Sequence, residues 1–146
     1  MPDDKIKPEH ADSYRLDDQI GFILRRASQR HLTIFAERVA DLTSTQFAVL
    51  AKLYEAGPIS QNELGRQTAM DGATIKGVID RLRKRAYVKT RPDPNDRRRI
   101  FVELTKTGTQ TYLDCVDAAV NITEKTLEPL NARETAVFLD LLRKIT

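Results

Sequence analysis

Residues 71–106 of the chain read DGATIKGVIDRLRKRAYVKTRPDPNDRRRIFVELTK, and this stretch decides the fold. It holds eleven lysines and arginines against five carboxylates, a net charge of +6, whereas the whole chain carries only +3. The pattern predicts a helix followed by two short strands, which are joined by a turn rich in arginine. Such a local basic surface suits the phosphates of duplex DNA, although a solvated charged face is the alternative.

Two short helices with a tight turn between them are predicted around the start of this stretch. Ser60 and Glu63 form a capping box that opens the first helix, and Asp71 caps the second. The second helix has apolar residues on one side and small or polar residues on the other, which is typical of the recognition helix of a helix-turn-helix. The residues that we expect to contact DNA on these helices are Ser60, Gln61, Gly72, Ala73, Thr74, Lys76 and Arg81.

Gly77 lowers the stability of the recognition helix by roughly 1 kcal/mol relative to alanine. We interpret it as a small residue that lets the helix approach the major groove closely. The alternative is that it makes room for a neighbouring helix.

The strands Tyr87–Thr90 and Ile100–Leu104 predict a hairpin, the wing of a winged helix, with a basic tip. Arg97 and Arg98 at this tip are further expected DNA contacts. We include Asp96 with them, because its carboxylate can hold the Arg98 side chain extended toward the narrow minor groove.

Further helices are predicted on both sides of the winged helix-turn-helix. They span residues 14–39, with Asp12 or Ser13 as the cap, a segment that starts with the capping box Thr43–Gln46 and stops at Gly57–Pro58, and residues 107–127 and 132–145. The fold class is therefore mainly α with a small β-wing. The first and last helices carry more apolar surface than a small winged helix needs, and self-association would bury it.

The composition indicates one domain, residues 1–146, with 40% hydrophobic and 31% charged residues. We expect a cytoplasmic location and no membrane contact, because no apolar segment suits a membrane span or a signal peptide. One cysteine and two distant histidines predict no metal site. We also expect no cofactor and no enzymatic activity, because neither a nucleophile–base set nor a glycine-rich phosphate loop is present.

Several motifs resemble the MarR family of bacterial winged-helix regulators. They are LTSTQFAVLAKL, SQNELGRQ, ATIKGVIDRLRKRAYV and DPNDRRRIFVELTKTG, which cover most of the chain in order. Two positions depart from the family pattern: Ala86 replaces a common glycine, and Thr90 replaces a common arginine. The resemblance implies a homodimer in which 1–42 and 107–146 form the dimerisation region and 43–106 form the DNA-binding lobe.

The resemblance also implies an effector pocket between the dimer helices and the lobe. The run YRLDDQIGFILRRASQRH is similar to a subgroup that controls the catabolism of aromatic acids, nicotinate derivatives or their CoA thioesters. We expect Arg15, Ser28 and His31 to supply the polar groups of a small apolar pocket. A packed, satisfied histidine is the alternative for His31, and other arginines of the first helix, Arg25, Arg26 and Arg30, are alternatives for the charge.

These features predict a repressor that a small aromatic or heteroaromatic acid releases from a pseudo-palindromic operator. A constitutive DNA-binding protein without an effector is the first alternative. The second is a redox-sensing regulator that uses Cys115, which sequence reasoning otherwise assigns to helix packing.

Overall fold

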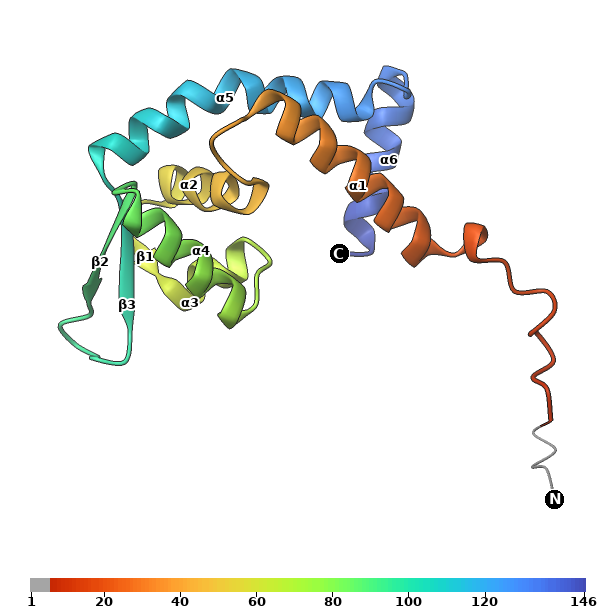
Figure 1. Ribbon diagram of the computed structural model, residues 1–146, viewed down its shortest axis with the longest axis horizontal. Helices are drawn as coiled ribbons and strands as arrows, with labels where there is room; N and C mark the ends of the chain where they lie inside the picture. Colours follow the sequence, from red (N-terminus) through yellow and green to blue (C-terminus); the bar gives the residue numbers. More distant parts are fainter. Residues whose placement is uncertain (1–5) are drawn as a thin grey trace.

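A small lobe with the wing forms one end of the molecule, and long helices extend away from it (Figure 1). The structure is a computed structural model that describes residues 6–146. Its elements are, in chain order, a short 3-10 helix Leu16–Asp18, α1 Ile20–Arg38, α2 Ser44–Ala56, β1 Ile59–Ser60, α3 Gln61–Gln67, α4 Gly72–Lys84, β2 Val88–Pro92, β3 Ile100–Leu104, α5 Lys106–Leu127 and α6 Ala132–Lys144.

The lobe is built from α2, α3, α4 and a three-stranded antiparallel sheet of order β1-β3-β2. Val102 of β3 pairs with Ile59 on one side and Thr90 on the other. The largest fully buried side chains all come from this lobe: Leu50, Leu64, Ile75, Ile79, Leu82, Val49, Val88 and Val102. The predicted fold class, mainly α with a small winged sheet, is confirmed, whereas the two-residue strand β1 was not predicted.

The helix starts follow their capping residues. Thr43 and Asn131 each form a complete capping box, with Gln46 and Glu134 respectively. The capping box predicted for Ser60 is only half formed. The Ser60 hydroxyl accepts the Glu63 N–H at 3.3 Å, but the Glu63 carboxylate accepts hydrogen bonds from Arg66 and Gln67 instead of the Ser60 backbone.

The first helix starts later than predicted. Residues 8–14 form turns, the 3-10 helix follows, and Gln19 has extended backbone angles, so that α1 begins at Ile20 rather than at residue 14. Asp17 and Asp18 favour turns and caps over helix interiors, which explains the interruption. Residues 1–5 of the predicted dimerisation region 1–42 lie outside the described residues.

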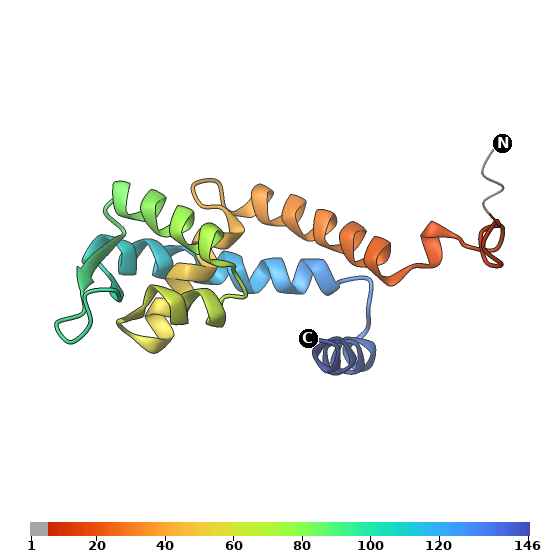
Figure 2. The same ribbon diagram turned by 90° about the horizontal axis from the view of Figure 1, so that it is seen from below.

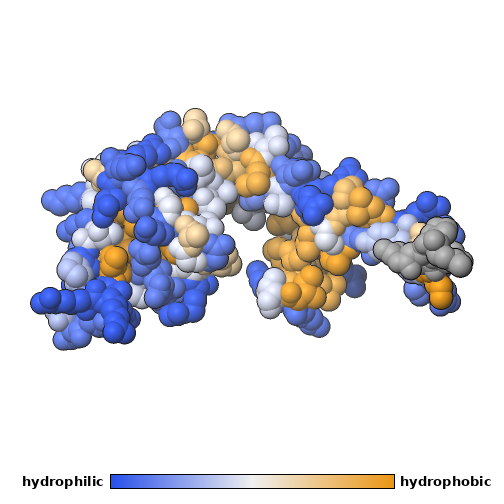
Figure 3. Space-filling view, turned by 60° about the horizontal axis from the view of Figure 1, so that its bottom comes forward, coloured by the Kyte–Doolittle hydropathy of each residue, from blue (hydrophilic) through white to orange (hydrophobic). Residues whose placement is uncertain are grey.

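The helix α1 lies alongside α5, whereas α6 is set apart from both (Figure 2). No residue of α6 is buried. Its apolar Val137 and Leu141, and Ile145 directly after the helix, are all more than half exposed. In Figure 3 the visible face of the lobe is mainly hydrophilic, and apolar side chains gather on the half of the molecule that contains α6. None of the helices within residues 6–146 is long and apolar enough to cross a membrane.

Candidate nucleic-acid interface and ligand pocket

The helix α4, which was predicted to be the recognition helix, is anchored through its inner face. Ile75, Val78, Ile79 and Leu82 are buried in the core of the lobe. At the helix start the Asp71 carboxylate accepts the Thr74 N–H at 2.7 Å, and this hydrogen bond holds the pKa of Asp71 below its usual range. The register of the outer face is therefore fixed by both a cap and a core.

The outer face of α4 presents the predicted DNA-contacting residues to solvent. Those that are exposed are Gly72, Ala73, Thr74, Lys76 and Arg81. Within 4 Å, and among residues 6–146, a Cβ atom built on Gly77 would meet only the flexible end of Arg81, at 3.7 Å. The interpretation that Gly77 makes room for a neighbouring helix is therefore wrong, and the open space above it is available to another molecule.

The wing tip is held by the buried carboxylate of Asp93. Asp93 is only 7% exposed; its carboxylate accepts the Asn95 N–H at 2.8 Å and lies 3.9 Å from Nε of Arg99. The guanidinium groups of Arg91 and Arg99 lie over the Phe101 ring, at 5.1 and 5.8 Å from its centroid. The guanidinium groups of these two wing arginines are thus held by contacts within the protein.

Arg97 and Arg98 differ from these two arginines, because their side chains have no hydrogen-bond or ion-pair partner among residues 6–146. The prediction that Asp96 holds the Arg98 side chain requires correction. The Asp96 carboxylate accepts the backbone N–H of Arg98 at 3.0 Å, so it shapes the turn and leaves the guanidinium free. A carboxylate two residues before the arginine reaches that N–H as an Asx turn, which is closer than the end of the side chain.

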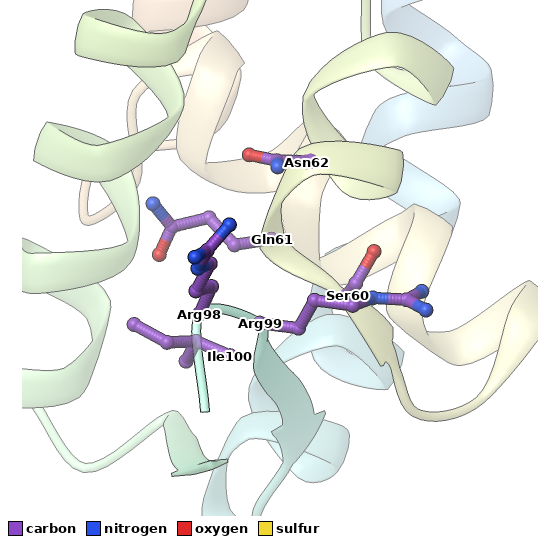
Figure 4. A pocket seen from close by; sticks show the side chains of 6 residues that line it. All are labelled: Ser60, Gln61, Asn62, Arg98, Arg99 and Ile100. Carbon is purple, nitrogen blue, oxygen red and sulfur yellow. The ribbon is translucent and has the colours of Figure 1, made fainter. Parts of the chain in front are cut away.

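A shallow hollow of about 40 Å³ lies between the wing and the start of α3 (Figure 4). Arg98 and Gln61 point to the same side of it, while Arg99 extends toward Ser60. Ser60 is buried and its hydroxyl caps α3, so a direct contact of this side chain with DNA does not fit the structure. Asn62, which the sequence reasoning missed, lines the hollow and is exposed. Its position at the start of α3 beside Gln61 was the available signal.

A larger, mainly apolar hollow of about 410 Å³ lies between α1, α5 and α6. Its lining residues are Leu24, Ala27, Ser28, His31, Thr123, Thr126, Leu127, Phe138, Leu139 and Leu142. The structure therefore brings Ser28 and His31 together, as predicted. Arg15 does not line it, because the chain before Ile20 is not a continuation of α1 and carries Arg15 away from that helix face. In place of Arg15, the threonines of α5 are the polar residues that the sequence reasoning missed.

His31 stands between this hollow and a second one of about 220 Å³, which Phe35, Ser44 and Phe47 also line. Its Nδ1 atom is 3.0 Å from Oγ1 of Thr126, in a partly buried hydrogen bond. The imidazole thus has a hydrogen-bond partner in the protein, as expected if His31 were simply a packed histidine. It nevertheless lines both hollows.

Arg30 is the alternative arginine for which the structure shows a different role. Its guanidinium donates to the backbone carbonyl of Lys125 at 3.0 Å and to that of Thr126, at the end of α5. A cation at a helix C-terminus satisfies free carbonyl groups and interacts favourably with the helix dipole. Arg30 therefore fastens α1 to α5, and Arg26 lies over the Phe22 ring at 5.9 Å.

Cys115 has the wrong electrostatic surroundings for a reactive thiol. Partial burial, and then the neighbouring carboxylates of Asp114 and Asp41, raise the pKa of the Cys115 thiol. A raised pKa lowers the thiolate fraction at neutral pH, and thiolate is the form that reacts with oxidants. Among residues 6–146, no group of three or more histidine, cysteine or carboxylate residues is placed to hold a metal ion.

Comparisons with known proteins give this geometry its context. The MarR family model matches residues 42–100. The HTH-type transcriptional repressor NicR of Pseudomonas putida is 44% identical over 90% of this chain and 85% of its own length.

Two solved structures share the fold. One is Bordetella bronchiseptica BpsR, whose DNA binding is regulated by 6-hydroxynicotinic acid; it is 40% identical, with a TM-score of 0.86 over 90% of this chain and 96% of its own. The other is a cysteine-to-serine mutant of Escherichia coli MarR in complex with operator DNA, 25% identical, with a TM-score of 0.81 over 95% of this chain and 99% of its own. These relatives are named as regulators and not as enzymes. The chain belongs to the MarR family.

Proposed function

We propose that the protein is a transcriptional repressor that binds a pseudo-palindromic operator as a homodimer in the cytoplasm and is released by a heteroaromatic acid. The outer face of α4 is the observation that carries the DNA-binding part. Small and basic residues are exposed along it, and free arginines stand at the adjacent wing tip.

The proposed DNA contacts divide by chemistry. Gly72, Ala73 and Gly77 leave room for base edges, while Lys76 and Arg81 can reach bases or phosphates. Arg97 and Arg98 would enter the minor groove beside the recognition helix, where a narrow groove attracts arginine. Gln61 and Asn62 at the start of α3 line the same hollow as Arg98 and suit a phosphate contact.

The proposed dimer uses residues 1–42 and 107–146, and the lobe 43–106 reads DNA. The support is the uncovered apolar surface of α6 and of the first half of α1, where Ile20 is 60% exposed. A two-fold axis through these helices would place two recognition helices in successive major grooves, about one helical turn apart.

The proposed effector is a hydroxylated nicotinate or a related aromatic carboxylate. BpsR, which shares 40% of its residues with this chain, responds to 6-hydroxynicotinic acid. The hollow between α1, α5 and α6 offers apolar walls with a few polar groups, including Ser28 and His31, which is the usual composition of a small-molecule site. Arg15 remains part of the proposal only as a residue that a partner chain brings to this region.

Operator titration tests the DNA-binding proposal. Arg98→Ala is expected to lower operator affinity about 10-fold to 100-fold, which corresponds to a lost contact of about 1–3 kcal/mol. Asp96→Ala is expected to have a smaller effect through the shape of the turn. Arg91→Ala is the matched control, because it removes one positive charge from the wing without removing a free guanidinium. Equal affinities for wild type, Arg98→Ala and Arg91→Ala at the same salt concentration would refute the proposed interface.

Titrating the operator complex with 6-hydroxynicotinic acid, nicotinate and hydroxybenzoates tests the effector. A coupling of about 1–3 kcal/mol is expected, equivalent to a 5-fold to 150-fold loss of operator affinity. His31→Ala and Ser28→Ala are expected to need higher ligand concentrations than wild type. If the ligands release these variants and wild type at equal concentration, the site lies elsewhere. If no ligand releases wild type, the constitutive DNA-binding protein becomes the better description.

A further inference from the structure

The lobe packs on the long helices through α2, and the end of the recognition helix provides a second junction with them through hydrogen bonds. The helix α4 closes with a Schellman motif, in which Tyr87 N–H donates to Leu82 O at 3.0 Å and Ala86 N–H donates to Arg83 O at 2.9 Å. Ala86 accordingly has a φ of 59°. The motif fixes the direction in which the chain leaves α4.

The same turn is fastened to the start of α5. Thr105, the cap of α5, donates from its hydroxyl to Ala86 O at 2.6 Å and from its backbone N–H to Tyr87 O at 3.1 Å. Gly108, in the first turn of α5, approaches Tyr87 O so closely that a Cβ there would lie 1.9 Å from it. Any rotation of α5 near Gly108 therefore meets the turn that ends α4.

Arg85 connects this turn to the segment between α1 and α2. Its guanidinium lies over the Tyr87 ring, at 4.7 Å from the centroid, and donates to the Tyr87 hydroxyl at 3.1 Å. A second donor of the same guanidinium reaches the backbone carbonyl of Asp41, in the segment between α1 and α2. The neighbours of Asp41 in that segment, Val39 and Leu42, are buried in the core, so the carbonyl is itself held in place.

We propose that Arg85 is a positioning residue that fixes the angle between the recognition helix and the dimerisation helices. Within residues 6–146, Arg85 is the only residue whose side chain forms a hydrogen bond between the end of α4 and the segment that joins α1 to α2. The guanidinium of Arg85 stacks on Tyr87 and donates its hydrogen bonds within the protein. In this respect Arg85 differs from Arg97 and Arg98 of the wing, whose guanidinium groups are free. Since the separation of the two recognition helices depends on this angle, Arg85 sets how strictly the dimer reads the spacing between half-sites.

The inference rests on the proposed binding to a two-fold operator, and the experiment keeps the two apart. An operator is first selected from random duplex DNA with the full-length wild-type protein. Duplexes are then made in which the half-site spacing is changed by one or two base pairs. Affinities for this series are measured for wild type, Arg85→Ala, Arg85→Lys and Arg83→Ala, together with thermal stability and the salt dependence of binding.

Wild type and Arg83→Ala are expected to prefer one spacing strongly, because Arg83 bonds only Thr90 within the lobe, at 3.3 Å. In Arg85→Ala the preference is expected to shrink by about tenfold, through weaker binding at the best spacing and little change at the others. Arg85→Lys keeps one donor for the Asp41 carbonyl and is expected to restore part of the preference.

Other outcomes overturn the inference. A uniform loss across all spacings with a shallower salt dependence would make Arg85 a phosphate contact. A uniform loss with a lower melting temperature would make its role one of stability alone. The inference would also be contradicted if Arg83→Ala reduced the spacing preference as much as Arg85→Ala does. The same holds if Arg85→Lys restored none of that preference. Failure to select any two-fold symmetric sequence would instead refute the proposed function.

Discussion

The lobe buries its apolar residues within itself, whereas α6 has apolar residues and buries none of them. Leu50, Leu64 and Leu82 of the lobe are completely inaccessible to solvent, while Leu141 of α6 is 55% exposed. The helices α4 and α6 are nevertheless alike, because each starts at a side-chain cap and has a similarly amphipathic sequence. The difference teaches that a cap and an amphipathic pattern are enough to form a helix, but the apolar face of the helix still requires a partner. For α6, residues 6–146 do not supply that partner.

The largest effect is expected from placing a charge on the apolar face of α6. Leu141→Asp should yield a monomer by analytical ultracentrifugation, with operator affinity lowered by a factor of about 100 or more, since two linked half-site contacts become one. Its lobe should remain folded, because Leu141 is not part of the hydrophobic core formed by residues 6–146. Ala136→Asp adds the same charge on the opposite face of α6 and should remain a dimer. A dimeric Leu141→Asp protein would show that α6 does not complete the interface.

A strong effect on stability is expected at the junction of the lobe and α5. In Gly108→Ala the new Cβ collides with the Tyr87 carbonyl, which is backbone and cannot move aside, so the loss should be about 3 kcal/mol or more in chemical denaturation. Gly65→Ala should cost less, because its nearest contacts are 3.1 Å to Met70 O and 3.2 Å to the Ile75 side chain. If both variants lose the same stability, the close approach at Gly108 is not what joins the two regions.

A mixed effect is expected on the outer face of α4. Gly77→Ala should raise the free energy of unfolding by up to about 1 kcal/mol through helix propensity, because no neighbour resists the methyl group. Operator affinity should nevertheless fall by about tenfold, comparable to one lost base contact. Gly21→Ala in α1, where the new Cβ meets nothing within 4 Å, should leave operator affinity unchanged. Unchanged operator binding by Gly77→Ala would remove this position from the DNA interface.

The smallest effect is expected at Ala86. This residue occupies the left-handed region with a φ of 59°, where a Cβ is unfavourable and glycine is not. Ala86→Gly should therefore stabilise the lobe by about 0.5–1 kcal/mol, after allowance for the greater freedom of glycine in the unfolded chain. Ala48→Gly, in the middle of α2, should destabilise it by about 1 kcal/mol. A loss of stability in Ala86→Gly would mean that the surroundings relieve the strain.

Local patterns were sufficient to predict most of the fold. The capping box at Thr43 and the cap at Asp71 set helix starts within a few residues, because their partners are three positions away in the chain. Strand β1 was missed because Ile59 and Ser60 become a strand only by pairing with Val102 and Phe101. The start of α1 was placed too early because apolar spacing continues into a segment that folds as turns.

The candidate sites were predictable only in part for the same reason. Exposure of the basic face of α4 follows from helical spacing, since the opposite face must be buried. No local signal showed that His31 would bond Thr126, or that Arg30 would bond the carbonyl groups beside it, 95 residues or more along the chain. The predicted pairing of Asp96 with the Arg98 side chain is wrong, because the Asp96 carboxylate bonds the backbone N–H of Arg98, which is nearer to it than the guanidinium.

The exposed apolar face of α6 also affects how the amount of active protein depends on its rate of synthesis. A newly made chain that relies on a second copy to cover Val137 and Leu141 is exposed to chaperones and proteases until it meets that copy. The encounter rate rises with the square of the concentration of chains, whereas clearance of single chains rises only in proportion to it. Operator occupancy would then respond to synthesis more steeply than linearly, so that a modest fall in gene dosage could lift repression without any ligand.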